Sequence, residues 1–397
     1  MKLLFIQGGS RVRKCKNGSF YVDGNFNNDI WKRYKSYCDD LTVILREKSE
    51  FYDENDIKDK LNNIDTNLIN LVLVEDVYKP KKNFLNLKMK KKIKKQIESA
   101  VIASDKIIIR SIGNFYTNTA LKYCKKYNKD YLIEVTGFAF EGLWYHSLYG
   151  KVVAIPREIK LRKSIKDAPY AVYVTEKALQ KRYPCKGKIL GCSDVELFNI
   201  DETNNEIFEK EKVILESFEN KKILLGTLGF VDVSFKGQKD VIKAIHVLDK
   251  RGFSNFYYEM VGTGKGIKLK KLIERYSLED RIKIVGALDH DDVKKWLKRL
   301  TLYVHPSYTE GLCRSIIEAM QLGCPVVCTN SGGNAELVSD SMMYKKKNVR
   351  ELVEILKKID IDLLKYQSRM NYEKAKLYKK EVLNKKRNRF YMSFTNN

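Results

Sequence analysis

The sequence of 397 residues lacks a long apolar run. A helix that crosses a bilayer needs about 20 consecutive apolar residues, and no segment of the sequence approaches that length. The amino-terminal apolar run ends at Gly8-Gly9, which makes it too short for the core of a secretory signal peptide. We therefore expect a cytoplasmic protein that is not embedded in a membrane.

Residue patterns for metal sites and disulfides are also scarce. The chain has four histidines, and its eight cysteines include no Cys-x-x-Cys pair. This argues against a zinc site and against a disulfide framework, so we expect mostly buried thiols. No Asp-x-Asp motif follows an apolar strand, and the acidic cluster Asp289–Asp292 lies at an expected helix start, where aspartate is a common cap. We expect neither a metal nor a cofactor.

Negative charge is underrepresented, since 50 acidic residues stand against 75 Lys and Arg and leave a net charge of +25. Such an excess predicts an anionic partner: nucleic acid, an anionic membrane surface or a phosphorylated substrate. A compositional bias toward Lys, Asn and Ile would give the same excess without any partner. No RNA-binding or helix-turn-helix motif is present, so charge alone supports a nucleic-acid binding protein, and we expect no nucleic acid.

The positive charge is concentrated in two segments, Lys79–Lys95 and Ile155–Lys166. If the second segment is a helix, Ile155, Ile159 and, less well, Ile165 form an apolar strip bordered by Arg and Lys. That pattern is typical of a helix lying at a membrane interface. A helix that buries its apolar strip and exposes a basic face to solvent fits equally well.

Short apolar runs alternate with helical periods twice along the chain. Continuous apolar runs of this length are typical of parallel strands covered by helices on both faces. The expected strands of the first part are Lys2–Gln7, Leu41–Leu45, Ile69–Val74, Lys106–Arg110, Tyr131–Val135, Tyr170–Val174 and Lys188–Gly191, with helices at Asn27–Cys38, Lys90–Ala103 and Thr117–Tyr127. Those of the second part are Lys222–Gly226, Phe256–Val261, Ile282–Val285, Leu302–His305 and Val326–Thr329. The alternation predicts an α/β protein with two doubly wound Rossmann-like domains facing each other across a cleft.

The expected domain boundaries follow from changes in composition. Residues 1–197 form the first domain, and the acidic, irregular segment 198–220 is the interdomain linker, with room for one helix. Residues 221–372 form the second domain. The basic segment 373–397 is expected to be helical.

The segment Thr301–Val338 carries the clearest sign of function. It reads as strand, loop, helix, strand, which predicts a parallel βαβ unit whose ligand lies beyond the carboxyl ends of the strands. A helix amino terminus near Arg314 suits a phosphate, while Glu310 and Glu318 suit the hydroxyls of a sugar or ribose. Phosphate and polyol side by side indicate a nucleotide-sugar. Taken singly, each of these residues could equally be a solvated side chain or a turn residue.

In their order, these residues resemble the donor-binding signature of retaining glycosyltransferases of family 4, which have the glycosyltransferase-B (GT-B) fold. The resemblance rests on two glutamates separated by seven residues, Glu310 and Glu318. The other matching pieces are Pro306-Ser307, Gly311-Leu312, Ala319-Met320, Gly323, Pro325-Val326-Val327, Gly332-Gly333 and Glu336-Leu337. The resemblance implies that the segment around Glu310, including Gly311, Leu312 and Cys313, binds a nucleoside-diphosphate sugar as substrate.

Further positions match the family pattern in order. Gly226-Thr227 is followed by Lys236, which matches the family's diphosphate lysine, whereas Thr227 stands where its arginine is expected. One ammonium neutralises a diphosphate incompletely, so we expect Arg314 to supply the second charge and to be catalytic together with Glu310 and Lys236. Gly262 is expected to line the donor cleft, and Gly286-Ala287-Leu288 to lie beside the nucleotide base.

The first domain is expected to bind the acceptor. Gly8-Gly9-Ser10 follows the first strand, where glycine allows close backbone approach to a phosphate or acceptor, although a plain strand-helix turn is as good an interpretation. Thr136-Gly137 ends another strand and should face the cleft. His146 is a candidate on the acceptor side, but a lone histidine is more often structural.

The resemblance implies a retaining, metal-independent transferase of hexosyl type that acts on a growing surface glycan such as capsule, O-antigen or exopolysaccharide. The expected partners are the nucleotide-sugar, a lipid-linked or oligosaccharide acceptor, and the anionic inner face of the cell membrane. A same-fold enzyme using a free sugar or sugar phosphate is the alternative. In the family the last helix returns to the first domain, and Leu377, Val382, Phe390 and Tyr391 are its expected buried side.

Overall fold

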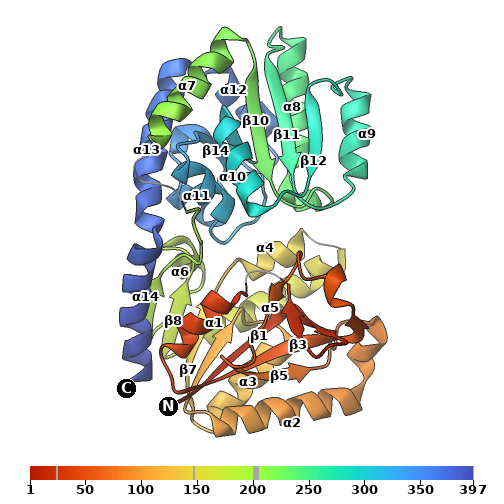
Figure 1. The fold of residues 1–397 in the computed structure, drawn as a ribbon, viewed down its shortest axis with the longest axis vertical. Helices are drawn as coiled ribbons and strands as arrows, with labels where there is room; N and C mark the ends of the chain where they lie inside the picture. The colour runs from red at the N-terminus through yellow and green to blue at the C-terminus, as the bar shows by residue number, and fades with distance from the viewer. Residues whose placement is uncertain (24–25, 146–147, 200–204, 397) are drawn as a thin grey trace.

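The computed structural model describes residues 1–23, 26–145, 148–199 and 205–396. Figure 1 shows two α/β domains stacked along the long axis of the molecule, each built on its own parallel sheet. This is the architecture expected from the alternation of strands and helices. None of the helices in the described ranges combines the length and apolarity that a bilayer span requires.

The first domain contains a nine-stranded sheet. Its parallel strands run in the order β5-β3-β1-β6-β7-β8-β9, and two short antiparallel strands, β2 and β4, extend it beside β1. The strands are β1 (Lys2–Cys15), β2 (Phe20–Val22), β3 (Asp40–Tyr52), β4 (Asn62–Asn63), β5 (Asn70–Val74), β6 (Lys106–Arg110), β7 (Asp130–Val135), β8 (Tyr170–Tyr173) and β9 (Lys188–Gly191).

The first strand is longer than the sequence predicts. The expected turn at Gly8-Gly9 is absent, because β1 continues through both glycines to Cys15. Its pairing with β3 is irregular between Ile6 and Arg11, so the glycines accommodate a bulge rather than a turn into a helix. The strand-helix turn considered for this segment is therefore wrong.

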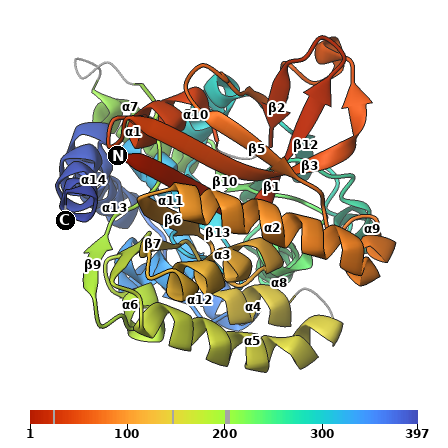
Figure 2. The same cartoon turned by 90° about the horizontal axis from the view of Figure 1, so that it is seen from below.

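Helices cover both faces of the first sheet. One face is covered by α2 (Leu87–Ala103), α3 (Phe115–Lys126) and α5 (Leu148–Lys166), which Figure 2 shows on the same side of the sheet. The other face packs against α1 (Asn28–Lys35) and α14 (Lys380–Thr395) through Trp31, Tyr34, Tyr391 and Phe394. The remaining helices of this domain are α4 (Ala139–Trp144) and α6 (Ala178–Arg182).

The second domain contains a six-stranded parallel sheet in the order β12-β11-β10-β13-β14-β15. Its strands are β10 (Ile223–Leu228), β11 (Phe256–Val261), β12 (Ile282–Gly286), β13 (Leu302–His305), β14 (Val326–Thr329) and β15 (Met343–Tyr344). Its helices are α7 (Glu206–Glu219), α8 (Gln238–Lys250), α9 (Ile267–Arg275), α10 (His290–Arg299), α11 (Arg314–Gln321), α12 (Val349–Lys357) and α13 (Ile361–Ala375).

Helix α7 was expected in a linker, but it is part of the second domain. The ammonium of Lys210 is buried and donates to the carbonyls of Leu297, Lys298 and Leu300 at 2.7 to 3.0 Å. These contacts cap the carboxyl end of α10 with a cation, which suits the negative end of a helix dipole. The linker prediction is therefore wrong for residues 206–219.

The last helix, α14, crosses back to the first domain (Figure 1). Tyr391 is buried there, and its hydroxyl donates to the buried carboxylate of Glu134. Phe390 is partly buried, but Leu377 and Val382 are exposed, contrary to prediction. The buried positions are instead Leu383, Arg387, Tyr391 and Phe394, because Leu377 lies in a turn before the helix begins at Lys380.

Candidate functional site

A cavity of about 780 Å³ lies between the two domains, beyond the carboxyl ends of strands in both sheets. This is where ligands bind in open parallel sheets. The first domain lines it with Gln7, Gly9, Ser10, Arg33, Arg110, Thr136 and Asp194, among others. The second domain contributes Lys236, His305, Glu310, Gly311, Leu312, Cys313, Arg314, Ser315 and Glu318. The predicted catalytic residues and Glu318 therefore meet at one cavity.

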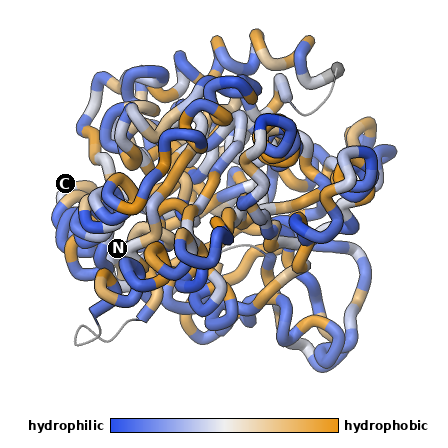
Figure 3. Tube along the Cα trace, turned by 90° about the horizontal axis from the view of Figure 1, so that it is seen from above, coloured by the Kyte–Doolittle hydropathy of each residue, from blue (hydrophilic) through white to orange (hydrophobic). Residues whose placement is uncertain are grey.

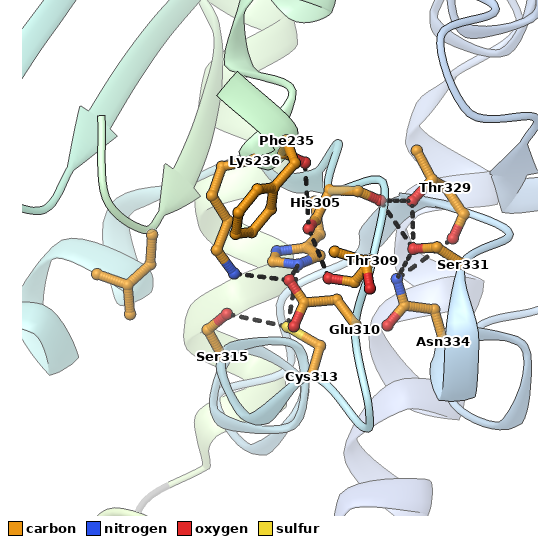
Figure 4. A network of polar contacts seen from close by, with 12 residues as sticks. Phe235, Lys236, His305, Thr309, Glu310, Cys313, Ser315, Thr329, Ser331 and Asn334 are labelled. Carbon is orange, nitrogen blue, oxygen red and sulfur yellow. Dashed lines mark hydrogen bonds and ion pairs between the residues drawn. The ribbon is translucent and has the colours of Figure 1, made fainter. Parts of the chain in front are cut away.

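Glu310 lies in the loop between β13 and α11, at the centre of a polar cluster (Figure 4). Its Oε1 accepts hydrogen bonds from Lys236 Nζ at 2.7 Å and from His305 Nε2 at 2.9 Å. Burial alone would raise the pKa of Glu310, but His305 and Lys236 outweigh it and hold that pKa well below its usual range. The carboxylate is therefore ionised at neutral pH.

His305, the last residue of β13, was not among the predicted site residues. It is buried, and Cys313 Sγ lies 3.3 Å from the same Nε2 that contacts Glu310. Burial lowers the pKa of His305, but Cys313 and Glu310 raise it overall to about 9. The imidazolium form therefore holds Glu310 in place. Its position at a strand's carboxyl end, five residues before Glu310, was the available signal in the sequence.

Lys236 ends a short turn, Ser234–Lys236, that precedes α8. Burial lowers the pKa of Lys236, but Glu310 opposes this effect and raises it overall, so the ammonium stays charged. Lys236, Glu310, His305 and Cys313 thus form one connected group. His305, Glu310 and Cys313 bring their ligand atoms within 4.8 Å of one another, as a metal site would require. The ammonium of Lys236 already provides a cation there, so we assign no metal to these residues.

Arg314 and Glu318 lie on α11, which begins at Arg314. Burial raises the pKa of Glu318 to about 7, and the guanidinium of Arg314 opposes the rise. Arg314 also acts across the cleft on Asp194 of the first domain. Burial would raise the pKa of Asp194, but Arg110 and Arg314 lower it overall. The charge of Arg314 thus acts on acidic groups of both domains.

Backbone contacts fix the loop that carries Glu310. Gly332 has a φ of +57°, and a Cβ there would lie 1.8 Å from the carbonyl oxygen of Glu310, so only glycine fits. Gly333 N donates to Gly311 O at 2.7 Å. The Gly-Gly pair of the sequence pattern therefore supports the loop that carries Glu310.

Gly311 lies where the second domain meets the first. A Cβ on Gly311 would lie 2.3 Å from the carbonyl oxygen of Thr136. Thr136 itself lines the cavity, and its hydroxyl lies 2.7 Å from that of Ser111. Gly137 is adjacent to the same contact. Thr136 and Gly137 thus pack against the second domain beside Glu310.

Two predicted donor-binding residues lie in the core of the second domain. A Cβ on Gly226 would lie 2.3 Å from Leu300, so the glycine is required by packing. Thr227 is buried, donates to Val304 O at 2.6 Å and accepts from Tyr258 at 2.8 Å. Neither residue lines the cavity, because their surroundings are filled by protein, and their part in donor binding stays a prediction.

The remaining predicted residues fall into three groups. Gly9 and Ser10 line the cavity, whereas Gly8 packs against Asn114 at the start of α3. Gly262, Gly286, Ala287 and Leu288 lie near the carboxyl ends of β11 and β12 but form no part of the cavity wall. His146 is outside the described residues.

Comparison with known proteins places the chain in a family. Residues 208–377 match the family Glycosyl transferases group 1. Protein CapJ of Staphylococcus aureus is 33% identical over 359 residues, which cover 90% of this chain and 85% of CapJ. The amylovoran biosynthesis glycosyltransferase AmsK of Erwinia amylovora is 32% identical over 114 residues, covering 27% of this chain and 28% of AmsK.

Solved structures share the fold. HepE of Anabaena in complex with UDP-glucose superposes with a TM-score of 0.64 and 16% identity, covering 99% of this chain and 100% of HepE. Sucrose-phosphate synthase from Thermosynechococcus elongatus superposes with a TM-score of 0.71 and 14% identity, covering 99% of this chain and 98% of the synthase. The chain therefore has the GT-B fold and belongs to the group 1 glycosyltransferases.

Proposed function

We propose that this glycosyltransferase moves a hexosyl-type sugar from a nucleoside-diphosphate sugar to a hydroxyl of a growing, lipid-linked surface glycan, with retention of anomeric configuration and without a metal. The observation that carries the proposal is the meeting of two cations, Lys236 and Arg314, with two carboxylates, Glu310 and Glu318, in one interdomain cavity. Cations suit the diphosphate, and carboxylates suit the hydroxyls of sugar and ribose.

The leaving diphosphate is the group that most needs stabilisation. As the bond from the anomeric carbon to the phosphate oxygen breaks, negative charge grows on that oxygen. Lys236, Arg314 and the backbone N–H groups at the start of α11 offset this charge. The same phosphate oxygen takes the proton of the attacking acceptor hydroxyl, so no separate base and no covalent intermediate with the protein are needed.

Lys236 changes partner in this scheme. Without a donor, its ammonium is paired with Glu310 Oε1 at 2.7 Å. A bound diphosphate offers it a more highly charged partner, and Glu310 is then free to accept a hydrogen bond from a sugar hydroxyl while His305 holds its orientation. Glu318, four residues beyond Arg314, accepts hydrogen bonds from the ribose hydroxyls.

The choice of a surface glycan rests on relatives. AmsK is named for amylovoran biosynthesis, and a further relative, WcaL of Escherichia coli, is named a putative colanic acid biosynthesis glycosyltransferase. HepE is solved with UDP-glucose, which makes UDP-sugars the first donors to test. The acceptor binds on the first-domain side of the cavity, near Ser10 and Thr136, and the enzyme works at the anionic inner face of the membrane.

Turnover with radiolabelled UDP-sugars and lipid extracts as acceptors tests the proposal. We expect label in the lipid fraction and no loss of rate with EDTA. NMR of the product should show a new linkage with the same anomeric configuration as the donor sugar. Label found only on a free sugar or sugar phosphate would favour the alternative acceptor class. An inverted anomer would contradict retention, and loss of rate with EDTA would contradict metal independence.

A further inference from the structure

Helix α5 turns an apolar ridge toward solvent. Its buried face consists of Ala154, Glu158, Leu161 and Ile165. On the opposite face, Val152, Ile155 and Ile159 are 75%, 56% and 64% exposed. Their spacing of three and four residues places them in one row along the helix. Of the two interpretations that the sequence left open, the one that buries Ile155 and Ile159 is therefore wrong.

Cations border this ridge on both sides. Lys151 and Arg162 fall on one flank, and Arg157 and Lys160 fall on the other; all four are exposed. The one acidic residue between Lys151 and Lys166 is Glu158. It is buried, and it is neutralised by Arg162 at 3.1 Å and Arg182 at 2.6 Å. The exposed charge along α5 is therefore of a single sign.

The ridge ends at a basic hollow. Lys163 and Lys166 continue the row toward the carboxyl end of α5, where a cavity of about 500 Å³ is lined by Arg162, Lys163, Lys166 and Lys186, together with Asp167 and Pro184. Arg162 is paired with Glu158, but Lys163, Lys166 and Lys186 stand against one carboxylate, and three ammonium groups suit a phosphate. An apolar row followed by a basic hollow corresponds to the two parts of a phospholipid, its acyl chain and its headgroup.

We propose that α5 is the element by which this enzyme docks on an anionic phospholipid bilayer, lying in the headgroup layer with Val152, Ile155 and Ile159 directed toward the acyl chains. The helix runs along the outer edge of the first domain (Figure 2), where the hydropathy-coloured tube of Figure 3 also has hydrophobic and hydrophilic residues side by side, and its exposed cations match the charge of an anionic bilayer surface. A nucleic acid would use the cations but not the apolar row.

The docking surface faces away from the core of the first domain, and α3 lies between α5 and α2 on that face of the sheet (Figure 2). Helices α5 and α2 cover the same face of the first sheet (Figure 2), so the lysines of α2 add positive charge on the same side of the molecule. Leu85 and Leu87, at the start of α2, are exposed as well, but they form no row along a helix. They offer a matched control. This inference concerns the membrane contact of the proposed function, yet its test does not need transferase activity.

The test is co-sedimentation of the full chain with phosphatidylcholine vesicles that contain or lack phosphatidylglycerol. We expect binding to the anionic vesicles at low salt and little binding to the neutral ones. The triple substitution Val152→Ser/Ile155→Ser/Ile159→Ser should weaken the partition constant roughly tenfold or more, whereas Leu85→Ser/Leu87→Ser should change it less than about twofold. Lys160→Gln/Lys163→Gln/Lys166→Gln should weaken vesicle binding chiefly at low salt. At high salt the charges of these three lysines are already screened in the native protein, so removing them should matter little there.

Three outcomes would overturn the proposal: no binding of the native protein to anionic vesicles at low salt, native-like binding by the α5 triple variant, or loss of binding by the Leu85/Leu87 variant alone. Unchanged circular dichroism and unchanged UDP affinity in each variant show that the fold and donor cavity are intact. Native UDP affinity without vesicle binding would reject the docking helix and leave the transferase proposal standing.

Discussion

Lys236 Nζ lies 2.7 Å from Glu310 Oε1, so the cation expected to hold a diphosphate and the carboxylate expected to hold a sugar are paired with each other at the cavity wall. The two residues are 74 positions apart in the sequence and lie in the segments that follow β10 and β13. Each partner keeps the other charged in a buried setting, where an isolated charge would be costly. The ion pair therefore lets both charges remain at the cavity wall.

Glu318→Gln should reduce kcat/KM by one to three orders of magnitude and leave the fold intact. We expect this because a neutral amide bonds ribose hydroxyls more weakly than a carboxylate, and each tenfold loss corresponds to about 1.4 kcal/mol. Steady-state kinetics measures it. Glu274→Gln is the control, since Glu274 is exposed on α9 and does not line the cavity. A folded Glu318→Gln enzyme with normal turnover would end the assignment.

The same substitution should stabilise the protein at high pH. Burial raises the pKa of Glu318 from 4.5 to about 7. Between these values the folded state holds a proton that the unfolded state has lost, so the free energy of unfolding falls as pH rises through this window. The glutamine of Glu318→Gln does not ionise. The free energy of unfolding of this variant should therefore exceed that of the native protein by roughly 1–3 kcal/mol above pH ~7, but by little near pH ~4.5. Urea unfolding across this range would contradict the account if the difference did not vary with pH.

Lys236→Ala and Arg314→Ala should each weaken binding of the nucleoside diphosphate product, and the double variant should lose it almost completely. Their effects should depart from additivity by about 0.5 kcal/mol or more, because both charges act on one diphosphate. Isothermal titration with UDP measures this. Lys239→Ala, at an exposed lysine three residues after Lys236, is the matched control. If Arg314→Ala bound UDP as tightly as the native protein, another residue would supply the second charge.

Gly311→Ala should disturb the contact between the domains. Its Cβ would lie 2.3 Å from the carbonyl oxygen of Thr136, so the loop carrying Glu310 must shift, at a cost of roughly 1–3 kcal/mol. We expect lower thermal stability and lower kcat/KM together. Gly142→Ala is the control, because a Cβ at that helical position meets nothing within 4 Å. Equal behaviour of the two variants would mean that the contact is unimportant.

Much of the fold could be predicted from the sequence because parallel strands buried on both faces are continuous apolar runs. β13 and β14 occur as predicted, at Leu302–His305 and Val326–Thr329. β1 was predicted too short because Gly8-Gly9 is typical of a turn, whereas here it lies at a bulge inside the strand. Leu377 and Val382 were wrongly predicted to be buried, because the buried side of α14 depends on the residue at which the helix begins.

The part of the candidate site that could be predicted from the sequence is the segment from Glu310 to Glu318, because its residues are close together along the chain. The site was not predictable where the fold brings distant residues together. The charge of Arg314 acts on Asp194 only because the fold places both at the interdomain cavity, and Gly226 matches the donor pattern but is held by packing against Leu300. His305 looked like the end of an apolar strand, and its role follows from a distance of 2.9 Å to Glu310.

The central claim is that the interdomain cavity binds a nucleoside-diphosphate sugar through Lys236 and Arg314. Thermal unfolding against a panel of nucleotide-sugars tests it most directly, because a ligand at 100 times its dissociation constant stabilises the folded state by ~2.7 kcal/mol. We predict a clear rise in melting temperature with at least one nucleotide-sugar and its nucleoside diphosphate, absent in Lys236→Ala/Arg314→Ala and retained in Lys239→Ala. A panel in which no nucleotide-sugar raises the melting temperature, or a rise that survives the double substitution, would contradict the account.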